Sequence, residues 1–338
     1  MRSNTKSKLN DDSIKKIVSS HFPNANVEKI VELKGGMFNS AYAISLSEDL
    51  MGHGKEFVLK VSVASTTKVL TYEKDLMYAE VQVFKKMLES GVPVPHIVAE
   101  DFSQSIVPYN YFIMTKLQGI EWQEGNKYFK KEDVSNLKFE LGRCLAQTHS
   151  NKGEYYGYVK DDKEFQFSSW RQAYTSMLNN IVKDGKKDNV KLPYDKVLET
   201  VEPFLPLLDE VTEPSLVNFD LWAKNIFVEK RDGVYCIEGI IDLERAFYGD
   251  PFADFVASFA IYNDISKEPD IQRGYESVTG KPFVISRNDE IRMILYRIYL
   301  TMIQGTEIYR FSKLIGLGLM LYNSLGLYNL MKELKKFK

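Results

Sequence analysis

One stretch, residues 216–259, constrains the fold of this chain more than any other. It reads LVNFDLWAKNIFVEKRDGVYCIEGIIDLERAFYGDPFADFVASF. Two apolar segments rich in β-branched and aromatic residues flank the turn residues KRDG, which predicts a β-hairpin. A hairpin brings its outer ends together, and here those ends carry Asp220, Asn225 and Asp242. Oxygen ligands of this kind suit Mg²⁺, which proteins commonly share with a substrate phosphate.

The spacing D-x-x-x-x-N is uninformative by itself, because residues 184–189 (DGKKDN) fit it as well. That second copy lies in a charged, glycine-containing segment with no apolar run after it, which predicts a solvated loop. The copy at Asp220 is followed in order by a strand, a turn, a second strand and IDLE. The alternative is that Asp220 and Asp242 only cap strand ends. The ordered succession of elements favours the metal-binding interpretation.

Composition excludes several classes of protein. The 338 residues include 44 Lys and Arg against 46 Asp and Glu, a formal charge of −2, which does not favour nucleic acid as a partner. A hydrophobic content of 44% predicts an ordered core. Cys144 and Cys236 are too few for a disulfide framework. The polar start of the chain lacks a signal-peptide core, so we expect a cytoplasmic protein.

An uncharged apolar run near the C-terminus, residues 314–331, reaches the length at which a membrane span becomes possible. Glycine, asparagine and serine interrupt it. We interpret it as one or two buried helices and expect no membrane partner.

The first third of the chain predicts strands around one inserted helix. Residues 8–22 have the pattern of a short amphipathic helix, and residues 27–65 that of three strands with a bend at Gly35 and Gly36. A helix over residues 72–91 precedes two further strands. From residue 131 onward helical patterns dominate, and the composition changes near residues 118–125, where we expect a hinge.

Lys60 interrupts an otherwise apolar strand, FVLKV. A lysine there ordinarily faces solvent; the alternative is a lysine held by a carboxylate and directed at phosphates. Glu80, at the edge of the apolar stripe of the next helix, is the candidate carboxylate, and Glu73 is its rival. Gly35 and Gly36 can offer backbone amides to a phosphate, although a plain hairpin turn explains them equally well.

Taken together, these segments resemble the aminoglycoside phosphotransferase and choline kinase superfamily, which has the protein-kinase-like fold. The matching segments, in order over residues 30–260, are GGMFNSAY (35–42), FVLKV (57–61), AEVQVFKKMLESGVPVP (79–95), FIMTKLQG (112–119), LGRCLAQTH (141–149), FDLWAKN (219–225) and IIDLERAFYGDPFADFVASF (240–259). A true protein kinase is disfavoured, because IDLE replaces D-F-G and no A-P-E segment follows.

The resemblance implies an α+β, bilobal protein-kinase-like fold. An N-terminal nucleotide-binding lobe, residues 1–117, would contain an antiparallel sheet with an inserted helix. A mostly helical lobe, residues 118–338, would carry catalysis and bind the substrate. The implied reaction moves the γ-phosphate of ATP (or GTP), with Mg²⁺, to a hydroxyl of a small molecule.

The resemblance also assigns roles to residues. Asp220 would orient the acceptor hydroxyl and accept its proton, while Asn225 and Asp242 would hold Mg²⁺. Lys60, steadied by Glu80, would bind the α- and β-phosphates. The remaining nucleotide contacts would come from Gly35, Gly36, Asn39 and Ser40 over the phosphates and from the backbone of Thr115 to Leu117 at the purine.

The acceptor is predicted less sharply. Several carboxylates would suit an amine-bearing acceptor such as an aminoglycoside, with choline, homoserine and fructosamine-type acceptors as alternatives. They are Asp250, Asp254, Asp264, Asp270, Asp289, Glu290 and Glu307. The alternative is that most of these carboxylates are solvated surface charges. The sequence predicts no oligomeric state.

Two positions beside the proposed base depart from the family pattern. The family usually has histidine two residues before the base and glycine immediately before it, where this chain has Asn218 and Phe219. The change leaves a nucleotide-binding pseudokinase as the alternative to an active phosphotransferase.

Overall fold

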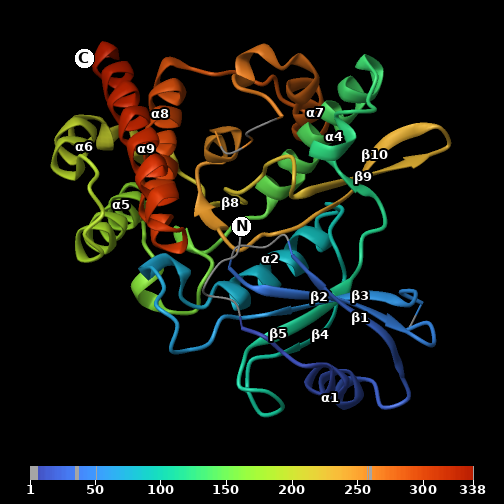
Figure 1. Ribbon diagram of the computed structural model, residues 1–338. Helices are drawn as coiled ribbons and strands as arrows, with labels where there is room; N and C mark the ends of the chain where they lie inside the picture. Colours follow the sequence, from blue (N-terminus) through green and yellow to red (C-terminus); the bar gives the residue numbers. More distant parts are fainter. Residues whose placement is uncertain (1–6, 35–37, 51, 257, 259–260, 338) are drawn as a thin grey trace. The chain divides into compact units, whose positions relative to one another are not determined.

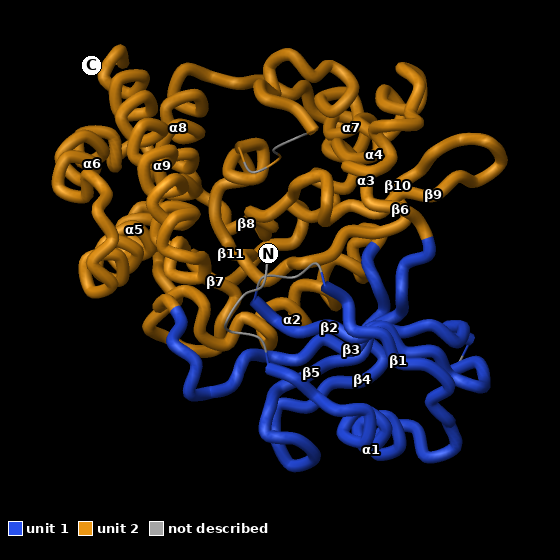
Figure 2. Tube along the Cα trace, viewed as in Figure 1, with its two compact units in different colours: residues 1–69, 94–118 blue, residues 70–93, 119–338 orange. Residues whose placement is uncertain are grey.

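The computed structural model describes residues 7–34, 38–50, 52–256, 258 and 261–337. The chain forms two compact units, shown in blue and orange in Figure 2. Unit 1 comprises residues 1–69 and 94–118, and unit 2 comprises residues 70–93 and 119–338.

Unit 1 is built on a five-stranded sheet in the order β1-β2-β3-β5-β4, with every neighbouring pair antiparallel (Figure 1). Its strands are β1 (Val27–Leu33), β2 (Ser40–Leu46), β3 (Glu56–Val61), β4 (Ile97–Asp101) and β5 (Tyr111–Thr115). Helix α1 (Asp11–His21) begins after Asn10, whose side chain accepts a hydrogen bond from the N–H of Ser13. The helix buries Ile14, Ile17 and Val18 in the core that the sheet provides, as its amphipathic pattern predicts.

The helix inserted between β3 and β4 belongs to unit 2. This helix, α2 (Leu76–Glu89), buries Glu80, Phe84 and Met87 on one face, which is the stripe that the sequence indicates. It is followed by Gly91, whose φ of +79° is the left-handed conformation that glycine adopts at helix ends. The boundary of the lobes near residue 118 stays a prediction.

Two three-stranded sheets lie in unit 2, in the orders β10-β9-β6 and β7-β11-β8. The strands are β6 (Ile120–Glu121), β7 (Gly157–Tyr158), β8 (Ser215–Val217), β9 (Ile226–Arg231), β10 (Val234–Ile240) and β11 (Phe247–Gly249). The pairing of β9 with β10 confirms the predicted hairpin. Its two turn residues, Asp232 and Gly233, both have positive φ, as a tight two-residue hairpin turn requires.

Helices make up most of the rest of unit 2. They are α3 (Trp122–Gly125), α4 (Lys131–Ser150), α5 (Trp170–Lys187), α6 (Tyr194–Val201), α7 (Pro269–Thr279), α8 (Arg287–Thr306) and α9 (Lys313–Leu334). Helices α4 and α7 cross at Gly142 and Gly274, where an added Cβ would lie 2.0 Å from a carbonyl oxygen of the other helix. Glycine is therefore required at this crossing.

The second D-x-x-x-x-N copy is not a solvated loop, so that prediction is wrong. Asp184 lies in the last part of α5 and accepts hydrogen bonds from the backbone N–H (2.6 Å) and the hydroxyl (2.9 Å) of Thr71. Its carboxylate serves a structural contact between segments far apart in sequence, which local composition does not reveal.

Residues 314–331 lie in one helix, α9, as predicted, but the prediction that this run is buried is wrong. One face of α9 is buried through residues such as Leu327, Met331 and Leu334, but only 22% of its most apolar 18-residue window is buried. Within the part of the chain that the structure describes, α9 is the one helix long and apolar enough to cross a membrane. A helix whose apolar residues show no helical periodicity is expected to be buried on all sides. Here the protein covers only one side of α9.

Candidate active site

The loop between β8 and β9 carries Asp220 and Asn225. The side-chain amide of Asn225 donates to the carbonyl oxygen of Asp220 (2.9 Å), and the N–H of Asp220 donates to Oδ1 of Asn218 (3.3 Å). The N–H of Ile241 donates to the carbonyl oxygen of Asn225 (2.9 Å), which ties the loop to the residue before Asp242. The hairpin therefore brings these three predicted residues into one part of unit 2.

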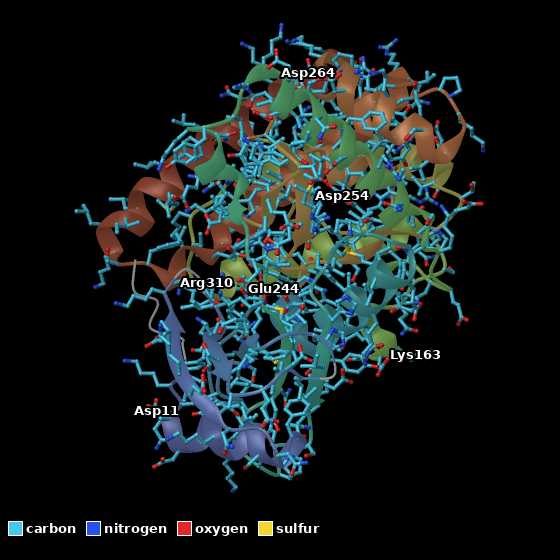
Figure 3. The ribbon with its side chains drawn as sticks, turned by 90° about the vertical axis from the view of Figure 1, so that its right-hand side faces the viewer. Asp11, Lys163, Glu244, Asp254, Asp264 and Arg310 are labelled. Carbon is cyan, nitrogen blue, oxygen red and sulfur yellow. The ribbon has the colours of Figure 1, made fainter. Side chains whose placement is uncertain are left out.

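Asp254 fixes this loop from inside unit 2, and its side chain is completely buried (Figure 3). Its carboxylate accepts hydrogen bonds from the backbone N–H groups of Asn218 (3.1 Å) and Phe219 (2.7 Å). His149 Nε2 lies 3.0 Å from the same carboxylate, and His149 Nδ1 lies 3.0 Å from the hydroxyl of Tyr275. Asp254 and His149 are thus structural supports of the Asp220 loop.

Phe219 takes a backbone conformation that side chains rarely adopt. Its φ is +61° although it stands immediately before the proposed base, and such strain persists only where the surroundings enforce it. The ring is 1% exposed and packs against Phe247 (centroids 5.1 Å apart) and Tyr299 (5.9 Å). Aromatic packing and the hydrogen bond to Asp254 together hold the strained residue.

Three carboxylates gather beside the end of the hairpin. One oxygen each of Glu80, Asp242 and Glu244 lies within 4.8 Å of the other two, with Glu80 buried. Asp242 also has a positive φ, +63°. Hard carboxylate oxygens at such spacing are the donors that Mg²⁺ takes, so this donor set fits a magnesium ion.

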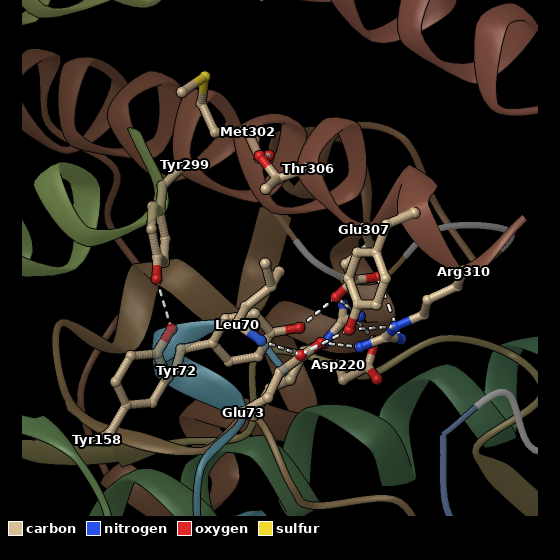
Figure 4. A network of polar contacts seen from close by, with 12 residues as sticks. Leu70, Tyr72, Glu73, Tyr158, Asp220, Tyr299, Met302, Thr306, Glu307 and Arg310 are labelled. Atoms are coloured by element: carbon tan, nitrogen blue, oxygen red, sulfur yellow. Dashed lines mark hydrogen bonds and ion pairs between the residues drawn. The ribbon is translucent and has the colours of Figure 1, made fainter. Parts of the chain in front are cut away.

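An alternating chain of charges extends from Asp220 into the helices (Figure 4). Arg245 contacts Asp220 (Nη1 to Oδ1, 3.5 Å) and Glu307 (Nη2 to Oε1, 2.9 Å). Glu307 also accepts a hydrogen bond from Tyr72 and lies 3.6 Å from Arg310, which in turn pairs with Glu73. The guanidinium of Arg245 therefore lies between the proposed base and a second carboxylate.

The electrostatics of Arg245 follow from that position. Its side chain is 13% exposed. Burial acts to lower its pKa, but the carboxylates of Asp220 and Glu307 outweigh burial and hold this pKa well above its ordinary value. Arg245 thus keeps its positive charge at any working pH.

The other predicted nucleotide contacts lie in unit 1, except Glu80. Asn39 and Ser40 are buried at the start of β2, and Lys60 lies on β3. Thr115 ends β5, where its backbone N–H donates to the carbonyl oxygen of His96 (2.9 Å); Leu117 follows two residues later. Gly35 and Gly36 lie outside the described residues. These nucleotide contacts remain predictions.

The partner proposed for Lys60 also remains a prediction, since Lys60 belongs to unit 1 and Glu80 to unit 2. Its rival Glu73 has partners of its own in unit 2. Besides Arg310, it accepts hydrogen bonds from the hydroxyl of Tyr309 (2.9 Å) and the backbone N–H of Leu70 (2.6 Å).

Most carboxylates expected to bind an acceptor amine have partners inside the protein. Asp250 and Asp289 pair with Arg292, and Asp270 pairs with Arg273. Asp264 caps a short 3₁₀ helix, Ile265–Lys267, by accepting a hydrogen bond from the N–H of Ser266, and Glu290 is exposed. Among the seven, Glu307 is the one that shares a described ion-pair network with Asp220.

Sequence reasoning assigned no role to Glu244 or Arg245. Glu244 could have been found from the sequence, since it stands two residues after the predicted metal ligand Asp242 in IDLE. Arg245 could not, because its contacts with Asp220 and Glu307 span 25 and 62 positions of the chain.

Comparison with known proteins decides the family. The sequence model of the phosphotransferase enzyme family matches residues 29–281 of this chain. The chain belongs to this phosphotransferase family. No curated protein sequence matches the chain.

Several solved structures resemble the phosphotransferase described here over nearly its full length. One is a putative fructosamine-3-kinase from Thermobifida fusca YX-ER1, with 15% identity, coverage of 97% of this chain and 100% of that chain, and a TM-score of 0.65. Choline kinase from Cryptosporidium parvum Iowa II has 13% identity, coverage of 97% of both chains and a TM-score of 0.63. A thermostable mutant of aminoglycoside phosphotransferase APH(4)-Ia has 16% identity, coverage of 95% and 98%, and a TM-score of 0.61.

These likenesses confirm the protein-kinase-like, α+β fold. The family match over residues 29–281 confirms the family resemblance that the sequence indicates. Membership of the family makes the chain a phosphotransferase of the small-molecule kind. Its acceptor is a separate question.

Proposed function

We propose that this protein transfers the γ-phosphate of ATP to a hydroxyl of a small molecule. The observation that carries the proposal is the Asp220 loop, held by Asp254 and Asn225 next to the carboxylates of Glu80, Asp242 and Glu244. A related structure, APH(4)-Ia, is a ternary complex with AMP-PNP and hygromycin B, and another, APH(2'')-Ib, is ADP-bound. Both are consistent with a nucleotide as phosphate donor here.

Asp220 acts as the base in this proposal. Its side chain is 22% exposed, so it is accessible to an acceptor. A carboxylate within hydrogen-bond reach of the acceptor hydroxyl orients that oxygen for attack on the γ-phosphorus and takes its proton as the new P–O bond forms. ADP leaves with the electron pair of the broken bond.

Asn225 and Asp242 hold Mg²⁺ in this proposal, and Glu244 is a further candidate ligand. The ion would neutralise charge on the transferred phosphate. Lys60, steadied by Glu80, together with Asn39, Ser40 and the backbone of Thr115 to Leu117, would hold the nucleotide.

An amine-bearing acceptor such as an aminoglycoside is the acceptor we propose. Arg245 supports it, because Asp220 and Glu307 flank the guanidinium and already stabilise a cation beside the base. An ammonium group of the acceptor would find the same two carboxylates.

The test is ADP release from Mg-ATP, and from Mg-GTP in parallel, with a panel of aminoglycosides, choline, homoserine, other amino alcohols and fructosamines. We expect turnover that depends on one class of acceptor. Absence of turnover with every acceptor, while ATP still binds, would instead support a pseudokinase, the alternative raised by Asn218 and Phe219.

Replacing Arg245 with glutamine is expected to strengthen the binding of amine-bearing acceptors. The substitution leaves Asp220 and Glu307 without the cation between them, so an acceptor ammonium no longer competes with a guanidinium. We expect the KM of such an acceptor to fall about tenfold, equivalent to about 1.4 kcal/mol, with the KM of ATP nearly unchanged. Arg273→Gln removes an arginine from a surface ion pair and is the matched control. A higher acceptor KM in Arg245→Gln would show that Arg245 contacts the acceptor directly.

A further inference from the structure

The exposed face of α9 is apolar over most of the helix length. We call it the α9 stripe; its side chains are 46–83% exposed and comprise Leu314, Leu317, Leu321, Tyr322, Leu325 and Tyr328. Figure 1 shows α9 lying along α8 and beside α6, the helices that cover its other side. A contiguous exposed apolar face of this size marks an interaction surface.

Positive charge flanks this stripe at both ends and on one side. Lys313 begins α9, and Lys332, Lys335 and Lys336 follow the stripe at the other end. At its side, Lys196 of α6 lies over the ring of Tyr328 (4.9 Å from Nζ to the centroid). The one acidic residue of α9, Glu333, pairs with Arg297.

A surface hollow of about 380 Å³ adjoins the stripe. Lys191, Asn189 and Lys186, which pairs with Asp195 (2.8 Å), line it on one side, and Tyr328 and Ser324 line it on the side of α9. The hollow thus joins cationic and polar groups directly to the apolar face, which is the pairing that a lipid with an anionic head group requires.

We propose that the α9 stripe docks on an anionic lipid bilayer, with the helix flat on the surface. Apolar side chains on one face and lysines around it are the features of helices that lie in the membrane interface. The two tyrosines suit the depth of the head groups. The proposal runs counter to the expectation, drawn from the sequence, that the chain has no membrane partner, and vesicle binding decides between the two.

Two other arrangements fit the charges less well. A second copy docked through the same stripe would place lysine-bearing helix ends against each other in either orientation, since both ends carry lysine. A membrane span would require α9 to leave α8 and α6 and to expose Leu327, Met331 and Leu334, which are buried.

Vesicle flotation tests this proposal. With full-length protein, we expect binding to vesicles of phosphatidylcholine and phosphatidylserine to exceed binding to phosphatidylcholine alone by about tenfold or more, and to weaken as salt is raised. The double variant Leu321→Gln, Leu325→Gln should lose vesicle binding while its circular dichroism spectrum is unchanged. Val234→Gln, at an exposed apolar position on strand β10, is the matched control and should bind as the wild type does.

Three outcomes would overturn the proposal. They are equal binding to neutral vesicles, absence of binding to either kind, and a stable dimer in solution that the double variant dissociates. The triple variant Lys332→Gln, Lys335→Gln, Lys336→Gln separates the electrostatic contribution to vesicle binding from the apolar one. It should reduce only the preference for anionic lipid.

Discussion

Asp220→Asn is expected to lower turnover by about 10²–10⁴-fold, the usual contribution of a positioned acid or base. Asparagine has nearly the same shape but cannot accept the proton of the acceptor hydroxyl. Nucleotide binding should be almost unchanged, because in the proposed mechanism Lys60, Asn225 and Asp242 hold the nucleotide and its metal. The measurements are ADP release with a working acceptor and the affinity for ATP by calorimetry.

The matched control for this variant is Asp195→Asn, which makes the same chemical change at an exposed surface carboxylate. It should leave both measurements unchanged. Turnover of Asp220→Asn close to that of the wild type would refute the role of Asp220 as the base, although not the family or the fold.

Phe219→Ala is expected to destabilise the protein by about 3–5 kcal/mol, the usual cost of deleting a buried aromatic ring. Phe219→Gly deletes the same ring but relieves the left-handed backbone, where a non-glycine residue costs about 1–2 kcal/mol. Glycine should therefore be the less damaging substitution by about that amount. Urea unfolding followed by tryptophan fluorescence gives both free energies.

Phe247 provides the matched control for the order of stability of the alanine and glycine variants. It is equally buried, packs against Phe219 and stacks on Trp170, but it lies in strand β11 without a positive φ. There glycine should be worse than alanine by about 0.5–1 kcal/mol. The same order of the two variants at both positions would show that the backbone of Phe219 stores no strain.

The conformation of Phe219 also bears on the departure from the family pattern. Glycine, usual at this position in the family, adopts positive φ without cost. Here the hydrogen bond from the Phe219 N–H to Asp254 and the packing on Phe247 and Tyr299 maintain the same kind of conformation. The Asp220 loop is thus kept in shape by side-chain packing, which supports an active enzyme over a degenerate one.

The sequence by itself determined the hairpin, the succession of Asp220, Asn225 and Asp242, the α+β fold and the family. These depend on local patterns: period-2 strands, turn residues and motifs of fixed spacing. For the same reason α1 and α2 were predictable, with their buried faces.

Only the tertiary structure decided which distant side chains meet. The contacts of Arg245 with Asp220 and Glu307, and the clustering of Glu80 with Asp242 and Glu244, join segments that no local pattern relates. The exposure of α9 is of the same kind. The sequence pattern of an apolar helix is the same whether protein covers both of its faces or only one. Burial depends on what packs against the helix, and the helix sequence does not show that.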